Sequence, residues 1–409
     1  MTAVKEISGG IVAAKGFKTS GIHCGLRANR AKLDLGIILA ESVCSAAGTF
    51  TLNRVKAAPV YLCMEHLENG KAQAIICNSG NANACAPEGS ENALRMAQAV
   101  AKATGVAVED VLVCSTGVIG QRLNVEAVEK GVPEAVALLA DTEEANDNMC
   151  KAILTTDTVK KEIAVSLTVG GKEVKIGGIC KGSGMIHPNM GTMLGFVTTD
   201  CAISSEMISE ALRECVRVTF NRVSVDGDTS TNDTCLVLAS GKAGNREITE
   251  KNKDYEDFKN GLYAVLLHLA KAIARDGEGA TKLVTCIVSG ASTEDKAETL
   301  AKSVIGSSLT KAAMFGADAN WGRVLCAMGY SGENFDPKNV DISFSSAAGR
   351  IKVCENGAGL PFDEELAKKI LTENEVVIEA LLREGSCEAT AWGCDLTYDY
   401  VRINGDYRS

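Results

Sequence analysis

The sequence is poor in aromatic residues, in proline and in histidine. Phe, Tyr and Trp make up 4% of the 409 residues, and there are only 6 prolines and 4 histidines. Basic blocks are also missing, and the formal net charge is -10. An acidic chain without clustered Lys and Arg lacks the electrostatic footprint of a protein that binds nucleic acid or an anionic membrane. We therefore expect neither as a partner.

Long hydrophobic runs are absent as well. No segment reaches the roughly 18 uncharged apolar residues that a membrane-spanning helix requires. The chain starts with MTAVKEISGGIVAAKGF, which lacks a basic region followed by a long apolar stretch. These two absences predict a soluble protein that is not exported, and we expect it in the cytoplasm.

The cysteines and histidines form no pattern typical of a disulfide framework or a metal site. The 16 cysteines are scattered from Cys24 to Cys394 without a C-x-x-C pair, and the 4 histidines form no H-x-x-x-H. In a long chain without an export signal, such cysteines behave as small buried hydrophobic residues in a reducing compartment. We predict no metal and no cofactor.

What the chain does contain is an alternation of apolar strands and amphipathic helices. With 409 residues, of which 40 are glycine, it is long enough for two domains of the mixed α/β class. Apolar periodicity and turn residues predict a hairpin with strands at 163–169 and 172–179, helices at 203–220 and 254–277, and a final strand at 387–403.

The segment 181–200, KGSGMIHPNMGTMLGFVTTD, indicates a site of self-cleavage rather than a linker. Pro188 disfavours the helical region for the residue before it, so the chain should approach Gly191 in an extended conformation. Gly191 has no Cβ, which leaves its carbonyl carbon open to attack. The hydroxyl of Thr192 could attack that carbon, convert the amide into an ester and let water complete the break. Thr192 would then become a new N-terminus.

An N-terminal threonine carries its own base. The freed α-amine has an unperturbed pKa of about 7.7–8.0 and lies within reach of the hydroxyl. One cleavage would therefore both process the chain and assemble a nucleophile. An isolated Gly-Thr pair is usually only a turn before a strand, so the hypothesis depends on the whole segment.

This segment resembles the processing site of the ornithine acetyltransferase family, arginine-biosynthetic enzymes also called glutamate N-acetyltransferases. The family pattern is KG-small-GMI-x-PNMATML, and this chain reads KGSGMIHPNMGTML, with Gly191 in place of the usual Ala. Other family motifs follow in the family's order along the full length of the chain. The resemblance implies self-cleavage into an α chain, residues 1–191, and a β chain, residues 192–409, with Thr192 as the nucleophile.

A second signal lies in VCSTGVIG, where a strand runs into a turn at Thr116 and Gly117. A hydroxyl and a neighbouring N–H at a strand end are suitable donors to a developing oxyanion. Taken alone, Ser-Thr-Gly is usually an ordinary turn. The resemblance implies that Thr116 and Gly117 form the oxyanion hole.

The resemblance also implies substrate contacts in three further motifs. TTDT supplies Thr155 or Thr156, and the spacing does not choose between them. GEGATK supplies Glu278, which sits between two glycines at the start of a strand. Lys181 is a plausible partner for a substrate carboxylate and Glu278 for an ammonium group.

The implied fold is a two-domain α/β architecture packed as an αββα sandwich. The implied activity is transfer of the acetyl group from N-acetylornithine to glutamate through acetyl-Thr192, a ping-pong cycle typical of covalent catalysis. Asn404 and Ser409 would close the site, because the family's C-terminus folds into it. The family also implies a heterotetramer of two cleaved pairs. The sequence does not predict whether acetyl-CoA serves as a second acetyl donor, since that depends on access to the site and no motif indicates the access.

Two other functions are compatible with parts of the chain. An N-terminal-nucleophile aminopeptidase or amidase of similar fold would share the self-cleavage and pass the acyl group to water. A phosphate- or nucleotide-binding protein could use KGSG as an anion cradle. That loop lacks the G-x-x-x-x-G-K-[ST] spacing, and no G-x-G-x-x-G opens a helix after a strand. The acetyltransferase is the interpretation that agrees with all the motifs.

Overall fold

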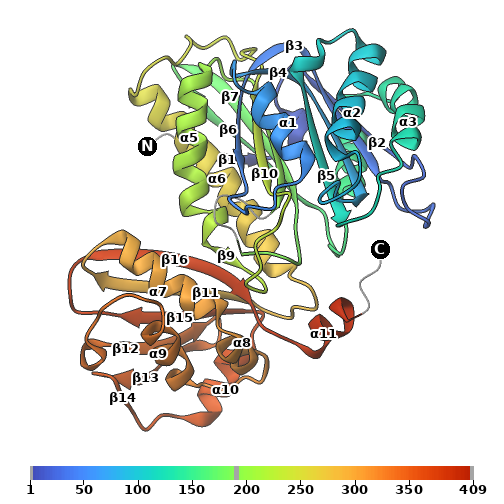
Figure 1. Cartoon of the computed structure of the whole chain (residues 1–409). Coiled ribbons are helices and arrows are strands. Elements are labelled where there is room, and N and C mark those ends of the chain that lie inside the picture. Colours follow the sequence, from blue (N-terminus) through green and yellow to red (C-terminus); the bar gives the residue numbers. More distant parts are fainter. Residues whose placement is uncertain (1–2, 188–192, 406–409) are drawn as a thin grey trace.

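The chain forms two lobes, each built on one β-sheet covered by helices (Figure 1). The structure is a computed structural model that describes residues 3–187 and 193–405. Helix α6 (Lys253–Arg275) packs on β6 and β7 of the first sheet and also contacts β11 and β16 of the second. The prediction of a two-domain α/β protein is confirmed.

The first sheet has nine strands. Eight follow the order β1-β6-β7-β8-β10-β3-β4-β5, and β2 pairs with β3 off this path. The strands are β1 (Lys5–Ile7), β2 (Phe17–Ile22), β3 (Leu35–Phe50), β4 (Lys71–Asn81), β5 (Val111–Val118), β6 (Lys161–Val169), β7 (Lys172–Lys181), β8 (Leu194–Thr199) and β10 (Thr234–Ala239).

Strands from both sides of the expected cleavage point are interleaved in this sheet. β8 and β10 follow that point in the sequence, run parallel to each other and lie between β7 and β3, which precede it. Every residue of β8 and β10 is buried. A break between β7 and β8 would therefore leave two chains held together by a shared hydrogen-bond ladder and a shared core.

Two helix ends in the first lobe are marked by capping residues. The Ser204 hydroxyl accepts the N–H of Met207 and starts α5 (Ser205–Val218), and Gly105, in the left-handed conformation, ends α2 (Gly89–Thr104). The remaining helices of this lobe, apart from short 3-10 turns, are α1 (Ala58–His66), α3 (Val125–Ala137) and α4 (Glu143–Ile153).

The second lobe has a seven-stranded sheet in the order β14-β13-β12-β15-β11-β16-β9. Its strands are β9 (Val223–Ser224), β11 (Leu283–Ala291), β12 (Asp341–Ser346), β13 (Gly349–Glu355), β14 (Ala358–Gly359), β15 (Glu375–Leu381) and β16 (Cys387–Cys394). Its helices are α7 (Glu294–Gly306), α8 (Ser308–Phe315), α9 (Trp321–Gly329) and α10 (Glu364–Thr372).

The expected hairpin is confirmed, and the expected final strand is partly wrong. β6 and β7 meet at Gly170 and Gly171, whose φ angles are 56° and 75°. The last strand stops at Cys394, because the carboxylate of Asp395 accepts two backbone N–H groups near the start of β11 and turns the chain away. Thr397 then caps a short helix, α11 (Tyr398–Asn404), drawn in red near the C-terminus in Figure 1.

Candidate active site

One cavity of about 130 Å³ gathers the described residues that the sequence singled out for catalysis or substrate binding. They come from β5, the loop after α4, the end of β7, the turn after α6 and helix α11. Gly191, Thr192 and Ser409 lie outside the described residues. The residues brought together at the cavity are Thr116, Gly117, Thr155, Thr156, Lys181, Glu278 and Asn404.

The expected oxyanion residues lie at the carboxyl end of β5, beside the parallel end of β4. Thr116 pairs in register with Ser79, and Gly117 with Gly80. Gly117 has a φ of 132°, and a Cβ on it would lie 2.3 Å from the carbonyl carbon of Gly80. Only glycine fits this approach. The carboxyl ends of adjacent parallel strands are a common position for ligand binding in α/β proteins.

Asn232 ties these strand ends to the loop before β10, and the sequence analysis missed it. Its amide nitrogen donates to the carbonyl oxygens of Ala82, at 2.6 Å, and Ser115, at 2.8 Å. Its amide oxygen accepts the hydroxyl of Thr231 at 2.6 Å. The buried, well-bonded amide lines the cavity and holds its wall in place. The only signal was its position in a polar loop that enters a buried strand.

The TTDT motif forms one wall of the cavity. The hydroxyls of Thr156 and Ser183 share a hydrogen bond of 2.8 Å. The N–H of Thr155 donates to the Asp157 carboxylate at 3.1 Å. Both threonines line the cavity.

Asp157 is the centre of a buried charge network behind that wall. Its Oδ1 accepts the Lys161 ammonium and the N–H of Gly182, each at 2.7 Å, and Lys161 also pairs with Asp276 at 2.5 Å. Burial alone would raise the pKa of Asp157, but the Lys181 and Lys161 cations and the Gly182 N–H hold it well below its usual range. The ionised carboxylate thus fixes the turn that follows Lys181.

Glu278 is buried at the cavity, although a loop glutamate is usually exposed. Glu278 is 7% exposed. Its backbone N–H donates to the Ser183 carbonyl at 2.8 Å, and its carboxylate accepts a hydrogen bond from the Asn404 amide at 2.6 Å. A Cβ on Gly184 would lie 2.3 Å from the Glu278 carboxyl carbon, so the close approach requires glycine there. In the described part of the chain, no Lys or Arg forms an ion pair with this carboxylate. A cationic ligand group would complement it.

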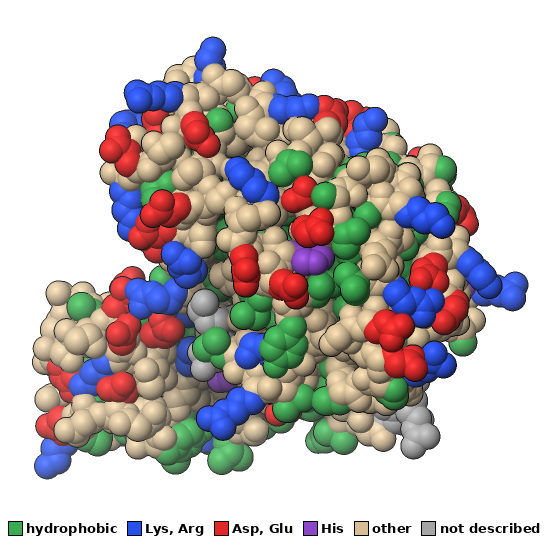
Figure 2. Space-filling view, turned by 45° about the horizontal axis from the view of Figure 1, so that its top comes forward, with side chains coloured by type: hydrophobic (Ala, Val, Ile, Leu, Met, Phe, Trp, Pro, Cys, Tyr) green, Lys and Arg blue, Asp and Glu red, His purple; other side chains and the backbone are tan. Residues whose placement is uncertain are grey.

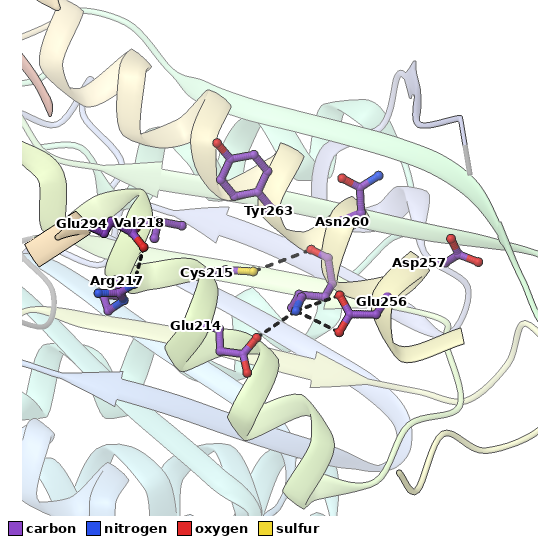
Figure 3. Close-up of a pocket in the computed structure, with 10 residues that line it drawn as sticks. Glu214, Cys215, Arg217, Val218, Glu256, Asp257, Asn260, Tyr263 and Glu294 are labelled. Carbon is purple, nitrogen blue, oxygen red and sulfur yellow. Dashed lines mark hydrogen bonds and ion pairs between the residues drawn. The ribbon is translucent and has the colours of Figure 1, made fainter. Parts of the chain in front are cut away.

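A larger cavity of about 490 Å³ lies between α5 and α6, near the start of α7 (Figure 3). The Lys259 ammonium pairs with Glu214 at 3.0 Å and with Glu256 at 2.9 Å, and Arg217 pairs with Glu294 at 3.3 Å. These charges satisfy one another, and the catalytic candidates lie elsewhere. The smaller cavity is therefore the candidate active site.

Charged side chains of both signs are mixed on the surface. On the face in Figure 2, acidic and basic side chains are interspersed rather than gathered in one basic patch. No helix between residues 3 and 405, residues 188–192 left aside, is long and apolar enough to cross a membrane. In the same part of the chain, no three His, Cys, Asp or Glu side chains are grouped to hold a metal ion.

Comparison with known proteins identifies the family. A model of the ArgJ family matches residues 18–409. The chain belongs to the ArgJ family. ArgJ is the ornithine acetyltransferase family that the cleavage segment resembles, so the family membership inferred from that segment is confirmed. The mixed α/β architecture is that of an ArgJ protein.

Individual ArgJ relatives are similar over nearly the whole chain. The arginine biosynthesis bifunctional protein ArgJ 1 of Clostridium acetobutylicum is 52% identical over 396 residues, which are 96% of each chain. ArgJ of Caldanaerobacter subterraneus subsp. tengcongensis is 50% identical and covers 98% of this chain and 99% of its own. A crystal structure of ArgJ from Bacillus halodurans, 46% identical with a TM-score of 0.50, covers 52% of this chain and 99% of that one.

Proposed function

We propose that this ArgJ protein is a glutamate N-acetyltransferase that moves the acetyl group of N-acetylornithine to glutamate. The observation that carries the proposal is the single cavity where Thr116, Gly117, Lys181 and Glu278 meet. It combines donors for an oxyanion with one cation and one carboxylate. The name of the relatives, arginine biosynthesis bifunctional protein, supports the same pathway.

The charges of the cavity match the charges of these substrates. Ornithine carries an ammonium group, which the buried Glu278 carboxylate would bind, and both amino acids carry a carboxylate, which Lys181 would bind. Asn404 donates to Glu278 and so holds that carboxylate toward the cavity. Thr155, Thr156 and the C-terminal Ser409 would complete the substrate contacts.

The nucleophile in this proposal is Thr192, freed by cleavage after Gly191. Its hydroxyl attacks the acetyl carbonyl, its α-amine takes the proton, and Thr116 and Gly117 stabilise the oxyanion. Ornithine leaves, and glutamate then takes the acetyl group from Thr192. One observation supports a cut chain: the solved B. halodurans chain, aligned almost in full, covers only 52% of this one. The burial of β8 and β10 between β7 and β3 supports two chains that stay together after the cut.

The proposal extends to a second acetyl donor and to the assembly. Because the relatives are named bifunctional, we infer that acetyl-CoA also acetylates Thr192, so that the enzyme makes N-acetylglutamate afresh. No resident cofactor is then needed. The interleaved strands support a stable pair of an α chain, residues 1–191, and a β chain, residues 192–409. We infer two such pairs in a cytoplasmic heterotetramer.

The deciding experiment follows ornithine release from N-acetylornithine with and without glutamate. Release should continue only when glutamate is present, and without it one acetyl mass should appear on Thr192. Thr192→Ala should remain uncut and inactive, because it lacks both the hydroxyl and the freed amine. Thr192→Ser should cut slowly and keep some activity, since the lost methyl loosens the rotamer. Sustained release with free acetate and no glutamate would instead support the amidase alternative.

A further inference from the structure

The loop that joins β9 to β10 holds the chain just before the expected cleavage point. Asp226 in this loop accepts two successive backbone N–H groups, from Met185 to Oδ2 at 2.6 Å and from Ile186 to Oδ1 at 2.9 Å. Each carboxylate oxygen thus accepts one of these N–H groups. Oδ1 also accepts the N–H of Asp228 at 3.2 Å, and Oδ2 accepts the Tyr400 hydroxyl at 3.2 Å. Such a pair of converging N–H groups is a typical anion-binding arrangement of the main chain.

The main chain needs this support because Met185 is in the left-handed conformation. Its φ is 54°, which is ordinary for glycine and uncommon for a long side chain. The conformation turns both N–H groups toward the carboxylate. Without the carboxylate, the two donors would be left unpaired and the unusual conformation would lose its compensation.

The same loop also holds the chain further along. The Thr229 hydroxyl donates to the carbonyl of His187 at 2.8 Å, and Ile186 forms an antiparallel bridge with Thr229. On the other side of the cleavage point, the N–H of Thr234 donates to the carbonyl of Met193 at 2.8 Å. Residues 226–234 therefore form hydrogen bonds to the chain on both sides of the peptide bond that is expected to be cut.

We propose that Asp226 is a positioning residue for self-cleavage. The inference rests on the proposed function, in which the Thr192 hydroxyl attacks the Gly191 carbonyl carbon. In that step the C–N bond breaks, the amine leaves with the hydroxyl proton, and water hydrolyses the resulting ester to a carboxylate. Asp226 exchanges no proton here. It restricts the conformations of the upstream flank, and an attack within one chain depends strongly on such alignment.

The test measures the cleavage rate of newly made precursor. Wild-type and Asp226→Asn chains are pulse-labelled during cell-free synthesis and chased on denaturing gels. Asn keeps one acceptor oxygen and places an NH₂ group against the second N–H donor. The variant precursor should be cleaved at least about tenfold more slowly than the wild type, and its Tm should be close to that of the wild type. Asp228→Asn, which removes an exposed carboxylate of the same loop, should cut at the wild-type rate.

Two further measurements separate positioning from stability and from catalysis. Thr229→Val removes only the hydroxyl that holds His187 and should also slow cleavage. This second variant tests the same inference if Asp226→Asn does not fold. Once cut, Asp226→Asn protein should keep a kcat within about threefold of the wild type, since Asp226 is not among the side chains that line the cavity. Folded Asp226→Asn that cuts at the wild-type rate would overturn the inference. An uncut wild-type chain would overturn the proposed function itself.

Discussion

The amide of Asn404 lies 2.6 Å from the carboxylate of Glu278 and donates a hydrogen bond to it. The two residues are 126 positions apart, one in helix α11 and the other in the turn after α6. Gly279, next to Glu278, lies directly under α11, where a Cβ would come 2.7 Å from the N atom of Tyr400. The C-terminal helix is thereby tied to the acidic end of the cavity, and substitutions at this end should change substrate binding more than folding.

Removing the charge of Glu278 should weaken binding of the substrate that carries an amine. Glu278→Gln keeps the shape and a carbonyl that can still accept the Asn404 amide. We expect kcat/KM for N-acetylornithine to fall by about 10- to 150-fold, which corresponds to about 1.5–3 kcal/mol for a hydrogen bond to a charged group. An N-acetyl amino acid with a neutral side chain serves as the comparison. Equal losses for both substrates would mean that Glu278 is structural.

A side chain at Gly184 should displace the Glu278 carboxylate. In Gly184→Ala the new Cβ would lie 2.3 Å from the Glu278 carboxyl carbon, so the carboxylate must move. We expect kcat/KM for N-acetylornithine to fall at least about tenfold, because a displaced binding group loses its alignment with the substrate. Gly329→Ala, at the end of α9, has nothing within 4 Å of its added Cβ and should behave as wild type. An active Gly184→Ala enzyme would contradict this packing.

Asp157 should contribute stability that disappears in acid. Its pKa is lowered in the folded protein against the effect of burial, by Lys181 and Lys161. A carboxyl group with a lowered pKa stabilises the fold above its unfolded pKa of about 3.9, and this contribution is lost as the pH falls below that value. Asp157→Asn should cost about 3 kcal/mol at pH 7, since Lys161 keeps only Asp276.

Thermal unfolding of Asp157→Asn at several pH values checks this prediction. The difference in Tm from the wild type should be full at pH 7 and should shrink below about pH 4. Asp147→Asn is the matched control, because it breaks the exposed Lys160 pair, which should contribute less than about 1 kcal/mol. A pH-independent difference for Asp157→Asn would mean that its carboxylate is not ionised in the fold.

Asp233 should have the opposite pH dependence. It is buried, its Oδ2 has no hydrogen-bond partner among the described residues, and burial raises its pKa well above the ordinary value. A raised carboxyl pKa means that the folded chain holds a proton that the unfolded chain releases, so stability falls as the pH rises above about 3.9. Asp233→Asn has no proton to release and should raise Tm, more at pH 8 than at pH 5.

The exposed Asp228 provides the control for this measurement. Asp228→Asn should change Tm by the same small amount at both pH values, because water solvates an exposed carboxylate in the folded and in the unfolded chain alike. If Asp233→Asn lowers Tm at pH 8, the Asp233 side chain is ionised and stabilising in the fold, which would contradict the prediction.

Several features of this protein depend only on neighbouring residues, and the sequence determined them. The β6–β7 hairpin follows from Gly170 and Gly171, which adopt left-handed conformations without a Cβ penalty. Likewise, Ser204 starts α5 and Gly105 ends α2, because capping bonds act within one helical turn. The family also followed from a contiguous segment, 181–200, whose residue pattern needs no structure to be read.

Other features were decided by contacts between distant parts of the chain. The apolar pattern at 387–403 predicts one strand, but Asp395 bonds to Thr281 and Lys282, more than 100 positions away, and the segment after it becomes a helix. Glu278 is buried because the Gly184 backbone and Asn404 pack against it. Such packing depends on which strands and helices come together in space, and the local periodicity of a sequence does not specify this arrangement. The sequence therefore determined the hairpin turn, the helix caps and the family, and the tertiary structure decided where the last strand ends and which side chains share a cavity.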